Sequence, residues 1–130
     1  MKYNVDYFIK KFSAIPEERW CVRMFDNGQG QNCAFGHLGA RTGHIGALET
    51  GGFFNKVLFP EARALQELFV ARGYDPTYPA FVNNGDDPNF QQATPKQRIL
   101  AALHDIKASQ VEVTNPPVYI EDIIPQEVEA

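Results

Sequence analysis

The strongest structural signal in this chain is a helix that begins near residue 94. Residues 94–97 (TPKQ) form a capping box with proline at the first helical position. Ile99, Leu103 and Ile106 follow at helical spacing and make one apolar stripe. Such a stripe has to be buried against other apolar faces, so the sequence predicts a helix-rich core.

Two further segments have the same periodicity and can pack against that helix. One covers roughly residues 5–12 after the N-cap candidate Asn4, and the other covers residues 59–73, with Pro60 near its start and Gly73 at its end. The apolar face consists of Val5, Phe8, Ile9 and Phe12 in the first segment and of Ala64, Leu65, Leu68 and Phe69 in the second.

The region after the first helix has a different pattern. A short helix is expected to begin at Pro16, and residues 20–25 (WCVRMF) are rich in strand-forming residues. Residues 26–32 (DNGQGQN) favour a turn because they combine two glycines with Asn and Asp. The sequence therefore predicts a small sheet or hairpin near residues 20–32.

Glycines mark the next two segments. Residues 33–40 (CAFGHLGA) are expected to form a helix with Asn32 as its N-cap. Gly36 and Gly39 each cost about 1 kcal/mol relative to alanine within a helix, so a close backbone contact is expected there. Residues 41–57 are glycine-rich and apolar, which indicates a loop or flap.

These elements predict a compact α+β domain that is helix-rich, with about four helices and a small sheet or hairpin. Residues 74–92 contain three prolines and a polar cluster, which indicates a loop. A chain of 130 residues suits one domain, and we expect the globular part to cover residues 1–108. Residues 109–130 carry five acids and no Lys or Arg, as an acidic C-terminal arm or tail would.

Charge and composition exclude several classes of protein. Residues 1–108 hold 12 basic and 11 acidic side chains, so this part of the chain has little electrostatic attraction to nucleic acid, and nucleic-acid binding is not expected. No apolar run approaches the ~20 residues needed to cross a membrane, and two cysteines are too few for a disulfide scaffold. We expect a cytoplasmic protein, in a bacterium or an infected host cell.

The arm also suggests self-association. Within residues 118–124 (VYIEDII), apolar and polar residues partly alternate, as in a strand that pairs with the edge of another subunit. We expect a homodimer to which residues 111–124 contribute, and a solvated tail is the alternative.

The order of the segments resembles a family of small bacterial and phage proteins of unknown function. The resemblance is carried by YFIKKF and IPEERW, by NCAFGHLGA, by VNNGDD and by TPKQRILAALHDI. Phe35 departs from the family's aliphatic residue, residues 41–57 look like an insertion, and the acid of the turn follows Gly85 instead of preceding it. The resemblance implies a mostly helical domain and a phage or mobile-element setting, but no established chemistry.

Cys33 is the candidate catalytic residue. A helix N-terminus lowers the pKa of a thiol, and a histidine can pair with the thiolate. His37 lies four residues further on the same predicted helical face, with His44 and His104 as alternatives. The competing interpretation is a small buried cysteine that packs against the glycine-containing helix.

A metal site is a weaker hypothesis. Cys21, Cys33, His37 and His44 are suitable ligand types, but the short Cys-x₂₋₄-Cys spacing of structural zinc sites is missing. We therefore expect neither a metal nor a cofactor.

The glycine-containing turn before Cys33 is a candidate anion cradle. N–H groups at a helix start bind phosphate or carboxylate, and glycines let a ligand approach the backbone. A plain turn would need the same glycines. The predicted ligand-binding residues are Gly28, Gly30, Asn32, Arg23, Arg41, His44, Asn84 and Asp86.

Together these observations predict a non-enzymatic binding protein. We expect it to engage a host protein or to sequester a small anionic, nucleotide-like ligand. On the resemblance, it would be phage-encoded and would antagonise host defence. The alternative is a small cysteine-dependent hydrolase or transferase that uses Cys33 and a histidine.

Overall fold

The computed structural model describes residues 3–41 and 47–114 of the chain. These residues contain five α-helices and two 3₁₀ turns, and no β-strand lies among them. The predicted α+β class is therefore wrong, because the described domain is all-α. The elements are α1 (Val5–Ser13), η1 (Glu17–Arg19), α2 (Ala34–His37), η2 (Thr50–Gly52), α3 (Pro60–Val70), α4 (Tyr78–Asn84) and α5 (Pro95–Thr114).

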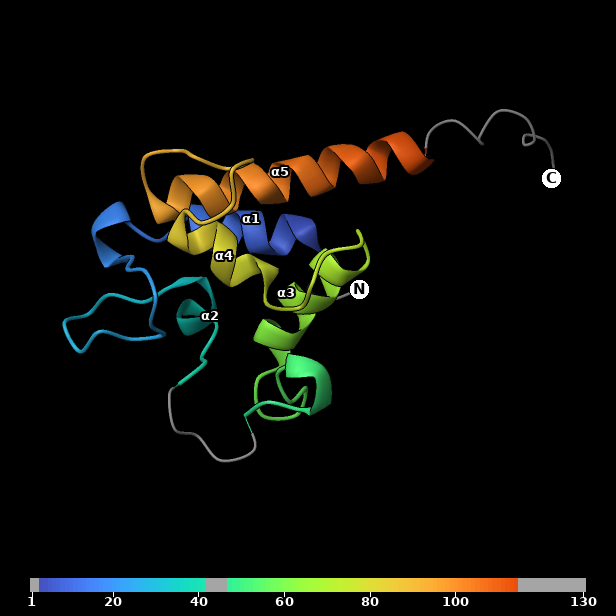
Figure 1. The fold of residues 1–130 in the computed structure, drawn as a ribbon. Helices are drawn as coiled ribbons and strands as arrows, with labels where there is room; N and C mark the ends of the chain where they lie inside the picture. Colours follow the sequence, from blue (N-terminus) through green and yellow to red (C-terminus); the bar gives the residue numbers. More distant parts are fainter. Residues whose placement is uncertain (1–2, 42–46, 115–130) are drawn as a thin grey trace, which may run out of the picture.

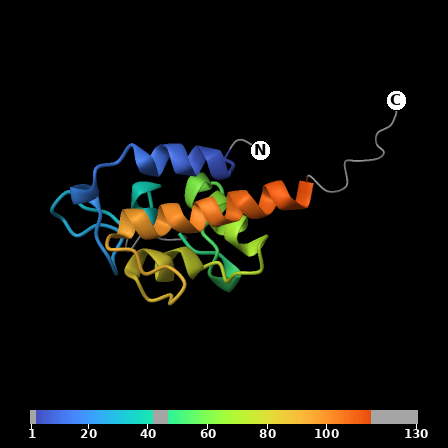
Figure 2. The ribbon, with the colours of Figure 1, turned by 90° about the horizontal axis from the view of Figure 1, so that it is seen from above.

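The helices pack in two rough layers. α1 and α5 contact each other and run side by side (Figures 1 and 2). α4 contacts α5 and also both α2 and α3, so it connects the two parts of the domain. The segment between η1 and α2 loops outward beside α2 (Figure 1).

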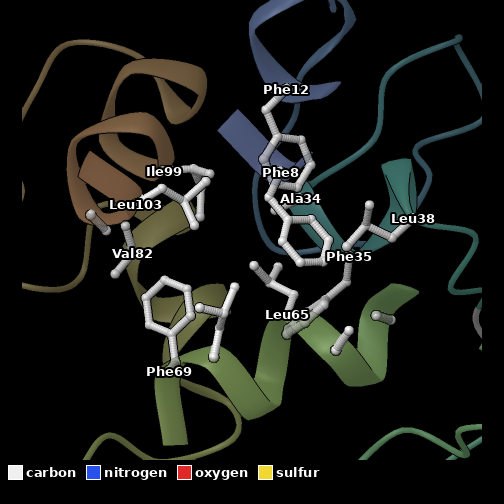
Figure 3. Close-up of a cluster of buried hydrophobic side chains, with 14 of the residues drawn as sticks. Phe8, Phe12, Ala34, Phe35, Leu38, Leu65, Phe69, Val82, Ile99 and Leu103 are labelled. Atoms are coloured by element: carbon white, nitrogen blue, oxygen red, sulfur yellow. The ribbon is translucent and has the colours of Figure 1, made fainter. Parts of the chain in front are cut away.

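The core lies where α1, α2, α3, α4 and α5 converge, as Figure 3 shows. The apolar faces predicted for the three periodic segments are buried there, except that Ile9 is only partly buried. Burial of these faces removes apolar area from water, which is the main favourable term in folding. The fully buried side chains at the centre include Phe8, Phe12, Leu65, Phe69, Val82, Ile99 and Leu103.

Two of the predicted start signals work as expected. Asn4 Oδ1 accepts a hydrogen bond from the Tyr7 N–H at 2.9 Å, and Thr94 Oγ1 accepts one from the Gln97 N–H at 3.1 Å. Each bond satisfies an N–H that has no partner within its own helix. Pro60 likewise begins α3.

The predicted hairpin near residues 20–32 is wrong. In the described chain, Trp20 and Asp26 each form only an isolated bridge with Asn32. Arg23 has a φ of 68°, which is incompatible with an extended strand. Its N–H donates to Asn84 Oδ1, at the end of α4, at 2.8 Å. This N–H is therefore not available for a hydrogen bond to a neighbouring strand.

The loop predicted for residues 74–92 is also wrong, because it contains α4. Pro79 occupies the first turn of α4, where a proline lacks only an N–H that has no partner there anyway. Gly85 ends the helix in the left-handed conformation, with a φ of 80°. The domain thus has one helix more than predicted among the described residues.

α5 continues across the predicted boundary at residue 108 and ends at Thr114. Residues 111–114, predicted as the start of a dimerising arm, are therefore helical. Residues 115–130, with the rest of that arm, lie outside the described residues.

Candidate functional site

A pocket of about 270 Å³ opens between the segment 23–25 and α4. Its lining residues are Arg23, Met24, Phe25, Cys33, Ala80 and Asn84. Met24 is 49% exposed. Val22 and Phe81, which adjoin lining residues in the sequence, are exposed apolar side chains as well. Single exposed apolar side chains are ordinary, whereas exposed apolar residues that gather around a pocket are typical of a binding surface.

Gly36 lets α2 approach the segment 23–25, which lines the pocket. A Cβ on Gly36 would lie 1.9 Å from the Phe25 carbonyl oxygen, which no side chain permits. The close contact predicted for Gly36 is therefore confirmed. Gly39 differs, because a Cβ there would meet only a Phe59 ring carbon at 4.0 Å, and its φ of 102° is what requires glycine.

Asn83 on α4 joins α4 to the start of α2 and to the segment at Cys21. Its side chain is fully buried, and its Oδ1 accepts a hydrogen bond from the Ala34 N–H at 3.0 Å. Its Nδ2 donates to the Cys21 carbonyl oxygen at 3.0 Å. The predicted N-cap Asn32 has no such role. Cys33 occupies the cap position of α2, and Asn83 supplies the missing acceptor from another helix.

Arg23 and two residues at the end of α4 form the polar side of the site. The Arg23 guanidinium donates to both carboxylate oxygens of Asp86, at 2.9 and 3.3 Å, and its N–H donates to Asn84. The structure thus brings together three of the predicted ligand-binding residues. Arg23 is the cation that lines the pocket, and its charge is already paired.

Cys33 is buried among atoms that keep its thiol protonated. Burial raises the pKa of Cys33, and hydrogen bonding from the N–H groups of Phe35 and Gly36 opposes that rise only in part. An activated cysteine needs the opposite direction. The thiol contributes a small apolar surface to the pocket wall and is predominantly neutral near neutral pH.

His37 has a different environment from Cys33. Its ring packs edge-on against Trp20, with ring centroids 4.6 Å apart. Its Nε2 is buried and has no hydrogen-bond partner in the described structure. Burial lowers the pKa of His37, and a hydrogen bond with the Arg19 backbone opposes this effect. The imidazole is therefore neutral near neutral pH.

The shifted pKa of His37 gives a testable pH dependence. The unfolded chain binds this proton more readily than the folded one, so His37 contributes stability that is present above its unfolded value of about 6.5 and lost as pH falls. We expect His37→Phe to weaken the loss of stability between about pH 7.5 and about pH 5.5. Urea unfolding at both pH values measures this loss of stability. An equal loss in the natural chain and in His37→Phe would contradict the role of His37.

The predicted anion cradle has most of its donors occupied. The Gly28 N–H donates to Asp26 Oδ1 at 2.7 Å, and the N–H groups of Gln29 and Gln31 donate to Asn27 Oδ1. Both turn glycines, the second being Gly30, adopt positive φ, as the predicted turn requires. An anion would have to displace bonds that the turn already makes to itself.

The remaining predicted ligand-binding residues have structural partners or cannot be placed. Asn32 Nδ2 donates to the Phe25 carbonyl at 3.0 Å. Arg41 donates to the carbonyls of Gly36 and Ala40, at 3.0 and 2.7 Å, and so caps the C-terminal end of α2. His44 lies outside the described residues. Among the residues that the structure describes, no three His, Cys, Asp or Glu side chains are grouped so that they could hold a metal ion.

Sequence reasoning missed the apolar half of the pocket. The sequence pattern predicts a strand for Met24 and Phe25 and a loop for Ala80, so it does not indicate that these residues converge. The one available signal was the order of Pro79 and Gly85, which marks the start and end of a helix. Asn83 gave no signal, because its partners lie 49 and 62 residues away.

No protein-family model, no curated protein and no solved structure matches the chain. The resemblance drawn from the sequence therefore stays a prediction. In the part of the chain that the structure describes, no helix is both long and apolar enough to cross a membrane.

Proposed function

We propose that this chain is a non-enzymatic binding protein whose pocket receives an apolar side chain of a protein partner. The observation that carries the proposal is the apolar mouth of the pocket, formed by partly exposed Met24 and bordered in sequence by exposed Val22 and Phe81. Apolar anchors that enter such pockets supply most of the energy at protein interfaces.

A protein partner fits these residues better than a small anionic ligand does. The turn at residues 26–32 uses its N–H groups internally, and Arg23 is neutralised by Asp86. A phosphate would therefore gain little charge attraction and would displace existing bonds. That the partner is a host protein, and that the chain is phage-encoded and opposes host defence, remain parts of the proposal that rest on the resemblance alone.

The alternative of a cysteine-dependent enzyme receives no support from Cys33. Burial raises the pKa of its thiol, and His37 packs against Trp20. A nucleophile and its base have to be within hydrogen-bond reach and have matched protonation states.

We expect peptides selected from a random library on the folded protein to contain a large apolar residue and to bind at the pocket. Met24→Asp and Phe81→Asp should each weaken the binding of such a peptide about tenfold or more, because the first places a charge on a lining residue and the second places one directly after the lining residue Ala80. Val57→Asp is the matched control, since Val57 is 81% exposed and does not line the pocket. Calorimetric titration measures the three affinities.

Two results would count against the proposal. One is a set of selected peptides that bind all three variants equally. The other is a rise in melting temperature with mono-, di- or cyclic nucleotides that disappears in an Arg23→Gln variant, which would favour the anionic ligand instead.

A further inference from the structure

The two cysteines lie on backbone segments that are paired with each other. The Cys21 N–H donates to the Asn32 carbonyl at 3.0 Å, and the Asn32 N–H donates to the Arg19 carbonyl at 2.9 Å. These two bonds make the parallel bridge between Trp20 and Asn32. Paired extended segments lie about 4.8 Å apart, and the residues that follow the bridge on the two segments are Cys21 and Cys33.

The backbone geometry favours a short separation between the two thiols. Cys33 itself is extended, with a φ of −82° and a ψ of 178°, and its N–H donates to the Phe25 carbonyl at 3.4 Å. Residues at matching positions of a parallel pair direct their side chains to the same face. A disulfide requires Cα atoms about 4.4–6.8 Å apart, and such pairing provides that separation.

We propose that Cys21 and Cys33 are a modification site at which a low-molecular-weight disulfide, such as oxidised glutathione, introduces a reversible intramolecular disulfide. Both cysteines are free thiols in this structure. An electrostatic interaction with Cys21 is also one of the causes that raise the pKa of Cys33, which agrees with the proximity of the two residues.

The two thiols have different access, which sets the order of the steps. Cys21 is partly exposed, whereas Cys33 is buried. The Cys21 thiolate attacks the glutathione disulfide, breaks its S–S bond and releases one glutathione thiolate, which takes up the proton that Cys21 lost. The Cys33 sulfur then loses its proton and attacks the Cys21 sulfur. The mixed disulfide breaks, and the second glutathione leaves with that proton.

The modification would act on the binding pocket, and this part of the inference rests on the proposed function. Cys33 lines the pocket, and the Cys21 carbonyl accepts the hydrogen bond from Asn83 that holds α4 in place. A bond between the two sulfurs takes the Cys33 sulfur from the pocket wall and fixes the segment 21–25 that carries Met24. The oxidised protein should therefore bind apolar peptides more weakly.

The test uses the folded, full-length chain incubated with oxidised glutathione, followed by alkylation and intact-mass measurement. We expect a product two hydrogens lighter than the starting protein, without bound glutathione. Trypsin cleaves after Arg19, Arg23 and Arg41, so the disulfide should join peptide 20–23 to peptide 24–41. Products that carry one or two glutathiones, or a disulfide between two copies of the chain, would overturn the proposal.

Single-cysteine variants test the order of the steps. Cys33→Ser should stop at one glutathione on Cys21, and Cys21→Ser should react about tenfold more slowly because its remaining thiol is buried. Equal rates in the two variants would overturn this order. The tryptic mapping of the natural chain stays decisive even where a variant fails to fold.

The disulfide and the binding function can fail separately. The disulfide is measured by mass in the absence of any peptide, so its formation is established even where no peptide binds the pocket. In the natural chain, oxidation should weaken peptide binding about tenfold. Equal affinity of the oxidised and reduced forms would overturn the regulatory role of the disulfide.

Discussion

Gly36→Ala should destabilise the domain by about 3 kcal/mol or more, which is enough to unfold much of a marginally stable protein. The added Cβ would lie 1.9 Å from the Phe25 carbonyl oxygen and 2.8 Å from its carbonyl carbon. Both atoms belong to the backbone, so no side-chain rotation can relieve the overlap. The helix or the segment that contains Phe25 has to move.

Movement of that segment would break further contacts. The Phe25 carbonyl accepts hydrogen bonds from the Cys33 N–H and from Asn32 Nδ2, at 3.4 and 3.0 Å. Separating it from Gly36 strains or breaks both bonds and deforms the pocket wall that Phe25 provides. The cost is therefore larger than for an ordinary overpacked site, where neighbouring side chains can adjust.

Gly28→Ala is the matched control for this substitution. A Cβ on Gly28 meets nothing within 4 Å, but its φ of 77° strains any side chain. We expect a loss of about 1 kcal/mol at this position. Urea unfolding followed by circular dichroism compares the two variants. Similar losses at Gly28 and Gly36 would show that conformational freedom, and not the contact with Phe25, accounts for the glycine at position 36.

The sequence was most informative where local signals and burial agree. Phe8, Leu65 and Leu103 follow helical spacing, and each belongs to a segment that contains its own helix start or stop signal. Gly36 was also predictable, because a glycine within a helix costs stability and so requires a reason. Such features depend on neighbours within about one or two helical turns.

The segment around Arg23 could not be predicted because its conformation depends on distant residues. Residues 20–25 have strand propensity, but tertiary contacts decide strand formation more than propensity does. Here the Arg23 N–H donates to Asn84 and the Arg23 guanidinium donates to Asp86, and these partners lie 61 and 63 residues away in the sequence. A pattern in one segment contains no information about these partners.

The sequence predicted only part of the pocket lining, because the rest depends on contacts between distant segments. Arg23, Cys33 and Asn84 were chosen for their chemistry, and the structure places all three in its lining. An anion site that uses Arg23 and Asn84 requires that the polar groups of these two residues are available. The hydrogen bonds that the turn and α4 make with these groups could be known only from the fold.

Asn83→Leu should cost about 2–4 kcal/mol, because it leaves two backbone groups without their partners while keeping a side chain of similar size. The Ala34 N–H and the Cys21 carbonyl both lose their hydrogen bonds to the Asn83 side chain, which is fully buried. The bond to Ala34 is buried, so its N–H keeps most of the penalty for burial without a partner, and the half-buried Cys21 carbonyl keeps part of it.

The same substitution should loosen the site locally. Without Asn83, the start of α2 is no longer tied to α4, and Cys33 at its cap position should be alkylated by iodoacetamide about tenfold faster in the folded protein. Gln92→Ala is the control, because Gln92 is exposed and its backbone carbonyl, which accepts a hydrogen bond from Arg98, is kept by the substitution. If Asn83→Leu lowered stability but left the alkylation rate of Cys33 unchanged, Asn83 would stabilise the core without holding the pocket in place. Faster alkylation of Cys33 in Asn83→Leu alone, with Gln92→Ala unchanged, would place the control of the pocket on the buried amide that joins α2, α4 and the segment at Cys21.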